Sequence, residues 1–198
     1  MLIAGLSEFF IIAGILFALK QRDRRQPTAL AYGYVLCAFT VAMSALLGAL
    51  KFLEIANVGS VYQALVYTST FFAMTGFTVI GLWPTLLNTN KVYIAYGLLA
   101  FALMGFIINL FISLPILGNL ALCIAVITSI LLIPHTRRYS IGGLSILLST
   151  VIFGLIITDN NIRIGVFHLC IGLFFVAMGL TFKHMDSNNY WFKSPAQS

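Results

Sequence analysis

The chain has 198 residues, of which 61% are hydrophobic and only 8% are charged. A soluble domain is usually about 25% charged, so this composition excludes an ordinary soluble protein and predicts a polytopic membrane protein with a single transmembrane domain over residues 1–198. The net charge of +6 does not indicate a nucleic-acid partner, because the basic residues stand in short clusters between apolar runs. Cys37, Cys123 and Cys170 lie inside apolar runs without CxxC spacing, which indicates neither a disulfide framework nor a zinc site.

Seven apolar runs predict the fold, which is an all-α bundle of seven transmembrane helices. The first run is not typical of a secretory signal peptide, because its basic cluster follows the apolar residues. The third run ends at Trp83-Pro84, an aromatic interface anchor followed by a helix breaker, and Pro115 leaves almost no loop between the fourth and fifth runs. The predicted spans are 2–19, 28–53, 59–82, 92–114, 116–133, 141–157 and 162–182.

The distribution of Lys and Arg predicts the orientation of these helices. On one side of the membrane the turns hold only Lys51 and Arg163. The turns on the other side hold Lys20, Arg22, Arg24, Arg25, Lys91, Arg137, Arg138, Lys183 and Lys193. Because basic residues concentrate on the cytoplasmic side, we expect the N-terminus outside, the C-terminus inside and an odd number of spans. We expect the membrane to be a bacterial inner (cytoplasmic) membrane.

The last span carries a stripe of glycines. Gly165, Gly172 and Gly179 recur every seven residues, so they share one helix face on which a neighbouring helix can approach closely. His168 lies three residues after Gly165 and four before Gly172. At about 100° per residue, its side chain is predicted to project toward protein rather than lipid.

A candidate binding site follows from the ionisable residues within the spans. Glu8 and His168 both lie about 9 Å below the outer helix ends, and Lys51 can reach them from the outer end of the second span. A charge inside a bilayer costs about 2.5–3.5 kcal/mol, so Glu8 should have a partner, either Lys51 or protonated His168. With Ser44 on the small polar face of the second span, these residues predict a small ligand-binding pocket in the outer leaflet. The alternative is a structural ion pair or hydrogen bond that locks the bundle.

The outer rim of this pocket is expected to hold Glu54, Asp159 and Arg163. Asp159 stands where the last helix should begin, so it is predicted to cap that helix. Arg163 follows four residues later and is predicted to be its ion-pair partner.

Recognisable catalytic motifs are missing from the sequence. It contains no HExxH, P-loop, GxSxG or CxxC, and neither a metal nor a cofactor is expected. Seven spans with the N-terminus outside resemble the architecture of the membrane hydrolases that include alkaline ceramidases. A closer resemblance would rest on a Ser and a His in the second span, an Asp, and an H-x-x-x-H pair in the seventh. Here Ser44 is followed at the matching position by Gly48, and His168 is followed by Gly172, so a three-histidine zinc site cannot be assembled.

Three classes of function are therefore predicted. The first is a module that binds, senses or transports a lipid or small molecule through the outer pocket, and it is favoured over an enzyme because the catalytic motifs are missing. The second is a membrane-embedded lipid-modifying enzyme. The third is an accessory subunit whose partner is a larger membrane protein complex, and the small-residue faces also suit a homo-oligomer. The lack of charged residues through the inner half argues against a continuous ion pathway.

Overall fold

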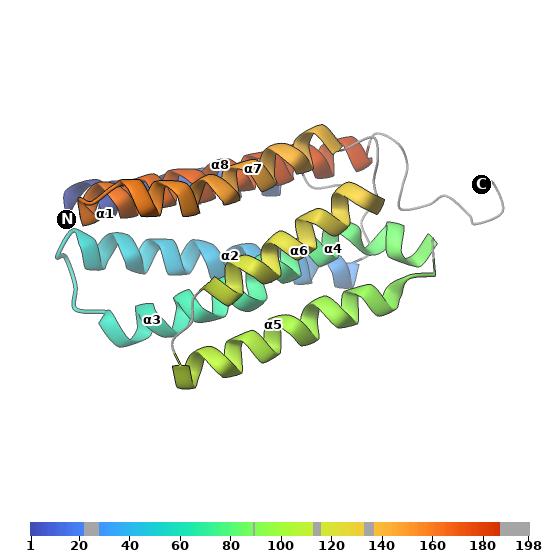
Figure 1. The fold of residues 1–198 in the computed structure, drawn as a ribbon, viewed down its shortest axis with the longest axis horizontal. Coiled ribbons are helices and arrows are strands. Elements are labelled where there is room, and N and C mark those ends of the chain that lie inside the picture. The colour runs from blue at the N-terminus through green and yellow to red at the C-terminus, as the bar shows by residue number, and fades with distance from the viewer. Residues whose placement is uncertain (22–27, 89, 113–115, 133–136, 187–198) are drawn as a thin grey trace.

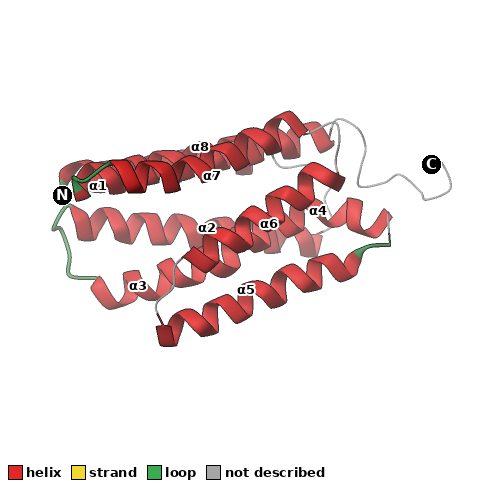
Figure 2. Cartoon of the chain, in the orientation of Figure 1, coloured by secondary structure: helices red, strands yellow, loops and turns green. Residues whose placement is uncertain are grey.

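The computed structural model describes residues 1–21, 28–88, 90–112, 116–132 and 137–186, and in these ranges all regular secondary structure is helical (Figure 2). A five-residue π-helix, η1 (Ser69–Ala73), joins two α-helices into one continuous rod. The α-helices are α1 (Leu2–Lys20), α2 (Thr28–Phe52), α3 (Gly59–Thr68), α4 (Met74–Asn88), α5 (Val92–Ile112), α6 (Ile116–Leu132), α7 (Arg137–Ile156) and α8 (Asn160–Asp186).

The helices have the length and composition of membrane spans. In the described ranges, six of them are long and apolar enough to cross a bilayer. They are α1, α2, the rod formed by α3, η1 and α4, then α5, α7 and α8. The remaining helix, α6, is apolar but shorter. The chain is therefore an all-helical, multi-pass integral membrane protein.

The boundaries differ from those predicted in one instructive place. The third rod does not end at Trp83-Pro84 but continues to Asn88, so the predicted helix break is wrong. Leu86 is fully buried, and its packing holds the turn that follows Pro84 in the bundle. Proline is tolerated within membrane helices when neighbouring helices stabilise the structure around it. The basic residues at 22–27, Pro115, His135 and the tail after residue 186 lie outside the described residues.

Helix α1 packs along α8 more extensively than any other pair of described helices, and α7 covers α8 from another side (Figure 1). Helix α2 also packs on α1, and the α3–η1–α4 rod, α5 and α6 complete the bundle beyond it. A Cβ atom at Gly172 would lie 2.5 Å from the Phe10 carbonyl oxygen, and one at Gly179 would lie 2.9 Å from the Ala18 Cα. The predicted close approach at the glycine stripe is confirmed, and α1 provides the neighbouring helix.

These contacts also fix the relative direction of the two helices. Gly165 meets Ile3 and Gly172 meets Phe10, so contact positions on α1 and α8 advance together by seven residues. Helices whose contacts advance in the same sense run parallel. The two helices therefore begin at the same end of the bundle, beside the N-terminus at the left of Figure 1.

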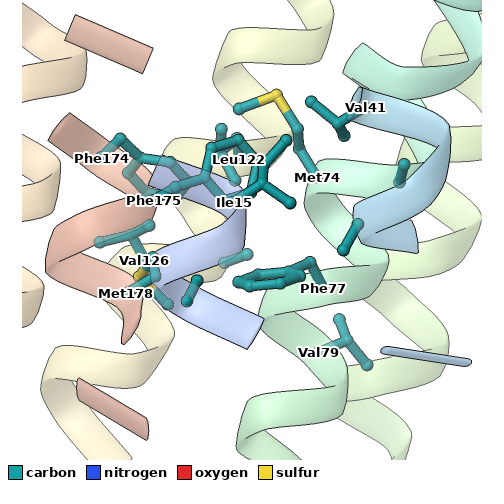
Figure 3. Close-up of a cluster of buried hydrophobic side chains, with 14 of the residues drawn as sticks. Ile15, Val41, Met74, Phe77, Val79, Leu122, Val126, Phe174, Phe175 and Met178 are labelled. Carbon is teal, nitrogen blue, oxygen red and sulfur yellow. The ribbon is translucent and has the colours of Figure 1, made fainter. Parts of the chain in front are cut away.

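The opposite half of the bundle is filled by aromatic and aliphatic side chains. Tyr34 stacks on Phe77 with ring centroids 4.4 Å apart, and Phe77 meets Phe175 and Phe182 at 5.3 Å each. All four rings are buried, and the Tyr34 hydroxyl donates a hydrogen bond to the Ala18 carbonyl (3.1 Å). Figure 3 shows Phe77 and Phe175 within the wider core, with Ile15 from α1 and Leu122 from α6. This dense core lies away from the half where α1 and α8 begin.

Candidate functional site

The structure brings Glu8 of α1 and His168 of α8 together. Glu8 Oε1 lies 3.5 Å from His168 Nε2, and the two residues are only 2% and 6% exposed. The parallel packing of α1 and α8 produces this contact, because Glu8 lies two residues before Phe10 and His168 lies four residues before Gly172, both toward the start of their helices from that close approach. Of the two partners predicted for Glu8, the structure therefore selects His168.

The other ring nitrogen of His168 is held by α1. Nδ1 lies 2.9 Å from Ser7 Oγ and 3.3 Å from the Ala4 carbonyl oxygen, and the Ser7 hydroxyl donates to the same carbonyl at 2.7 Å. A carbonyl oxygen can only accept, so this surrounding favours a proton on Nδ1 that is donated to Ser7 Oγ. The Nε2 edge is then directed at Glu8, with Nε2 3.5 Å from Oε1.

Gly48 of α2 makes room for the Glu8 carboxyl. A Cβ atom at position 48 would lie 2.6 Å from Glu8 Cδ and 3.1 Å from Cε2 of the Tyr62 ring on α3. Both the Glu8 carboxyl and the Tyr62 ring therefore lie against Gly48, where a side chain on any other residue would collide with the carboxyl. The sequence marks Gly48 only as part of a small-residue face, and this contact gives the glycine a specific role.

A cavity of about 280 Å³ opens beside the Glu8–His168 pair. It lies between α1 and α8 on one side and the α3–η1–α4 rod on the other, with α2 as a third wall. Besides Glu8 and His168, its polar lining residues are Ser44, Tyr62, Ser69 and Thr70, and the rest of the wall is apolar. Its lining residues are Glu8, Ile11, Val41, Ser44, Ala45, Tyr62, Val66, Ser69, Thr70, Met74, Phe167, His168 and Ile171.

The π-helix η1 shapes the wall opposite the acid. A π-helical turn is wider than an α-helical turn, and such turns often occur at functional sites. Ser69 and Thr70 of η1 line the cavity, and the Ser69 hydroxyl donates back to the Val66 carbonyl at 3.0 Å. The methyl group of Thr70 is held against Gly118 of α6. A change in η1 would therefore be transmitted both to the cavity and to α6.

Ser44 and Lys51, both on α2 and both predicted to bind the ligand, differ in their position relative to the cavity. The buried Ser44 lines the cavity, as the prediction requires of a site residue. Lys51 is exposed at the end of α2, and its Nζ lies 4.7 Å from the Tyr62 ring centroid and 5.8 Å from that of Phe52. Lys51 is not a lining residue, so it contacts the cavity only through Tyr62. The grouping of Glu8, Lys51 and His168 is thus reduced to the Glu8–His168 pair, with Lys51 at the rim.

The other residues of the predicted rim are placed differently. Asp159 Oδ1 accepts a 2.9 Å hydrogen bond from the Ile162 backbone N–H, which confirms that Asp159 caps α8. The predicted ion pair with Arg163 is wrong, because the Arg163 guanidinium reaches Asn160 Oδ1 at 2.8 Å instead. Because the Asp159 carboxylate already accepts a hydrogen bond from the backbone, the Arg163 guanidinium donates instead to Asn160, three residues before it on the same helix. Glu54 is exposed in the turn after α2 with a φ angle of 60°.

Two contributors escaped the sequence analysis. Ser7 precedes Glu8 but had no recognisable motif, and its role depends on the ring of a residue 161 positions away. Asn161 accepts a 3.0 Å hydrogen bond from the Ala4 backbone N–H, so the beginning of α8 caps the beginning of α1. The parallel pairing of the two helices creates both contacts. No local signal in the sequence indicates them.

The chain matches no protein-family model, no curated protein and no solved structure. Within the described ranges, no group of three or more His, Cys, Asp or Glu side chains is arranged to hold a metal ion. The geometry of the cavity and of the Glu8–His168 pair is therefore the main guide to the function.

Proposed function

We propose that this protein binds a lipid or small amphipathic molecule in the cavity beside Glu8 and His168, as a binding, sensing or transport module. The observation that carries the proposal is the coincidence of a 280 Å³ cavity with the buried Glu8–His168 pair, whereas the other buried polar side chains of the described residues are uncharged Ser, Thr and Asn. Buried ionisable groups in membrane helices are costly and are typical of ligand or proton sites. Pockets that combine an apolar wall with a few convergent polar groups are typical of small-molecule sites.

We also propose seven crossings with the N-terminus outside and the C-terminus inside. The parallel packing of α1 and α8 supports this topology, because five helical rods stand between them and parallel spans require an odd number of intervening crossings. In that topology α6 is the fifth span despite its length. The excess of basic residues on one side favours placing the cavity in the outer leaflet. A bacterial cytoplasmic membrane remains a prediction.

The packing in the half of the bundle away from the cavity favours a bound molecule over a continuous transport pathway across the membrane. The cavity ends above the aromatic core that contains Tyr34, Phe77 and Phe175, all of them at most 2% exposed. Close-packed rings of this kind leave no route for a hydrated ion. The arrangement supports a pocket that is open at one side only.

A lipid-modifying enzyme is the second candidate, and one contact favours it. Ser7 Oγ lies 2.9 Å from His168 Nδ1, which is the distance expected between a nucleophile and its general base, although that role requires the tautomer whose Nδ1 carries no proton. Ser7 lines a separate, apolar groove between α1 and α8 rather than the cavity, and its hydroxyl is donated to Ala4. A serine-directed fluorophosphonate probe tests the candidate: covalent labelling of wild type and none of Ser7→Ala would favour the enzyme.

The binding proposal is tested with a variant that fills the cavity. Ser44→Leu places an apolar side chain in the pocket, whereas Ser145→Leu makes the same change at an exposed serine of α7. Native mass spectrometry of protein extracted in mild detergent should find a small molecule or lipid on wild type and Ser145→Leu, and much less on Ser44→Leu. Equal occupancy of all three proteins would contradict binding in this cavity.

A further inference from the structure

The unused hydrogen-bonding capacity of the cavity indicates what kind of head group it accepts. Both nitrogens of His168 are engaged, Nδ1 by Ser7 and Ala4 and Nε2 by Glu8. Glu8 Oε2 receives no hydrogen bond from the described residues, although the acid lines the cavity. A carboxylate oxygen accepts hydrogen bonds, so the unfilled position calls for a donor on the ligand.

The charges around the cavity also favour a hydrogen-bond donor on the ligand. Glu8 and His168 are the lining residues that can exchange protons at ordinary pH, and neither Lys nor Arg lines the wall. An anionic head group would be buried beside an acid without a free cation, which is costly in a region of low dielectric constant. A cationic head group would instead pair with Glu8, and the pair would be neutral overall.

Aromatic rings complete the surroundings of such a cation. Tyr62 and Phe167 both line the cavity, and aromatic faces attract ammonium groups. The Tyr62 ring already lies close to an ammonium group of the protein, because Lys51 Nζ is 4.7 Å from its centroid.

We infer that the cavity is selective for a small amphipathic amine, whose ammonium group is held by Glu8 between the hydroxyl of Ser44 and the ring of Tyr62. The inference rests on the proposed function and names its ligand class. At about 280 Å³ the cavity is at the small end of ligand sites, so the apolar body of the ligand must be short. Ile11, Val66 and Met74 provide the apolar surface for it.

Three probes of equal chain length separate the possible head groups: hexylamine, 1-hexanol and hexanoate. Each is titrated against the purified protein in lipid nanodiscs, with the thermal midpoint of unfolding as the readout. Hexylamine should raise the midpoint in a saturable way, 1-hexanol should bind about tenfold or more weakly, which corresponds to ~1.4 kcal/mol, and hexanoate should not bind. This comparison uses wild-type protein alone and so does not depend on the folding of a variant.

Variants then assign the binding to the acid. Glu8→Gln should weaken hexylamine by about tenfold or more, whereas Ser145→Leu, at an exposed serine of α7 outside the cavity lining, should leave its affinity unchanged. Hexanoate binding that equals or exceeds hexylamine binding would overturn the amine class, and so would an affinity for hexylamine that Glu8→Gln leaves intact. If hexylamine binding survives Glu8→Gln but is abolished by Ser44→Leu, the cavity remains the binding site and only the ligand class is overturned. Saturable binding of none of the three probes would overturn both the ligand class and the proposed function.

Discussion

The contact between α1 and α8 provides the sharpest prediction, because glycine lets two backbones meet there. In Gly172→Ala the new Cβ would lie 2.5 Å from the carbonyl oxygen and 2.8 Å from the carbonyl carbon of Phe10. Ordinary contact begins at 3.4 Å, and backbone atoms of a helix cannot rotate away as a side chain can. Helix α1 must therefore move away from α8 by about 1 Å, a gap that forfeits a quarter to a half of the dispersion energy along the contact.

The magnitude follows from the way membrane helices associate. Their association depends on close van der Waals packing rather than on the hydrophobic effect, so a separated contact has little to replace it. Overpacking of this kind costs about 1–3 kcal/mol. For a chain of this length each kcal/mol lowers the thermal midpoint by about 2–4 °C, so Gly172→Ala should unfold about 2–12 °C below wild type in the same detergent.

Two control variants make the measurement specific. Gly97→Ala on α5 adds the same methyl group where no atom lies within 4 Å, and helix propensity predicts a gain of about 0.5–1 kcal/mol. Leu173→Ala removes a side chain that is 46% exposed, so it should have a milder effect than Gly172→Leu. The reasoning is refuted if Gly172→Ala is as stable as wild type, or if Leu173→Ala is the more damaging of that pair.

Three further predictions concern the site and its supports. Glu8→Gln and His168→Ala should show a coupling of about 0.5–3 kcal/mol in a double-mutant cycle of unfolding free energies, and additive effects would mean that the two side chains do not interact. Gly48→Ala displaces the flexible Glu8 carboxyl rather than a backbone, so it should reduce ligand occupancy more than stability, whereas Gly59→Ala, with only a 4.0 Å contact, should change neither. Asp159→Ala should lower the free energy of unfolding by about 0.5–2 kcal/mol through loss of the α8 cap. Asp159→Asn keeps a side-chain acceptor and should unfold close to the wild-type temperature. An equal loss of stability in both variants would exclude the capping role.

The parts of this structure that the sequence predicts are those set by local pattern. The apolar runs predicted the helices because about 20 residues suffice to cross a bilayer. The seven-residue repeat of Gly165, Gly172 and Gly179 predicted close approach because the repeat keeps them on one helix face. His168 was predicted to face protein for the same reason, and it is 6% exposed.

The parts that the sequence does not predict depend on contacts between distant segments. The turn after Pro84 stays helical because Leu86 is buried against other helices, and a single-helix rule has no access to that packing. Glu8 could be assigned two partners from depth alone, whereas only the parallel register of α1 and α8 selects His168 over Lys51. The cavity itself depends on η1, and no residue pattern in Ser69–Ala73 distinguishes a π-helical turn from an α-helical one.

The most direct test of the central claim is a ligand density map of the protein in a lipid nanodisc, without added ligand. We predict non-protein density within the cavity, in contact with the Glu8 carboxyl and the Ser44 hydroxyl, while Glu8 and His168 remain paired. A map in which side chains fill the cavity, or in which Glu8 and His168 point to different sides of the bundle, would contradict the account.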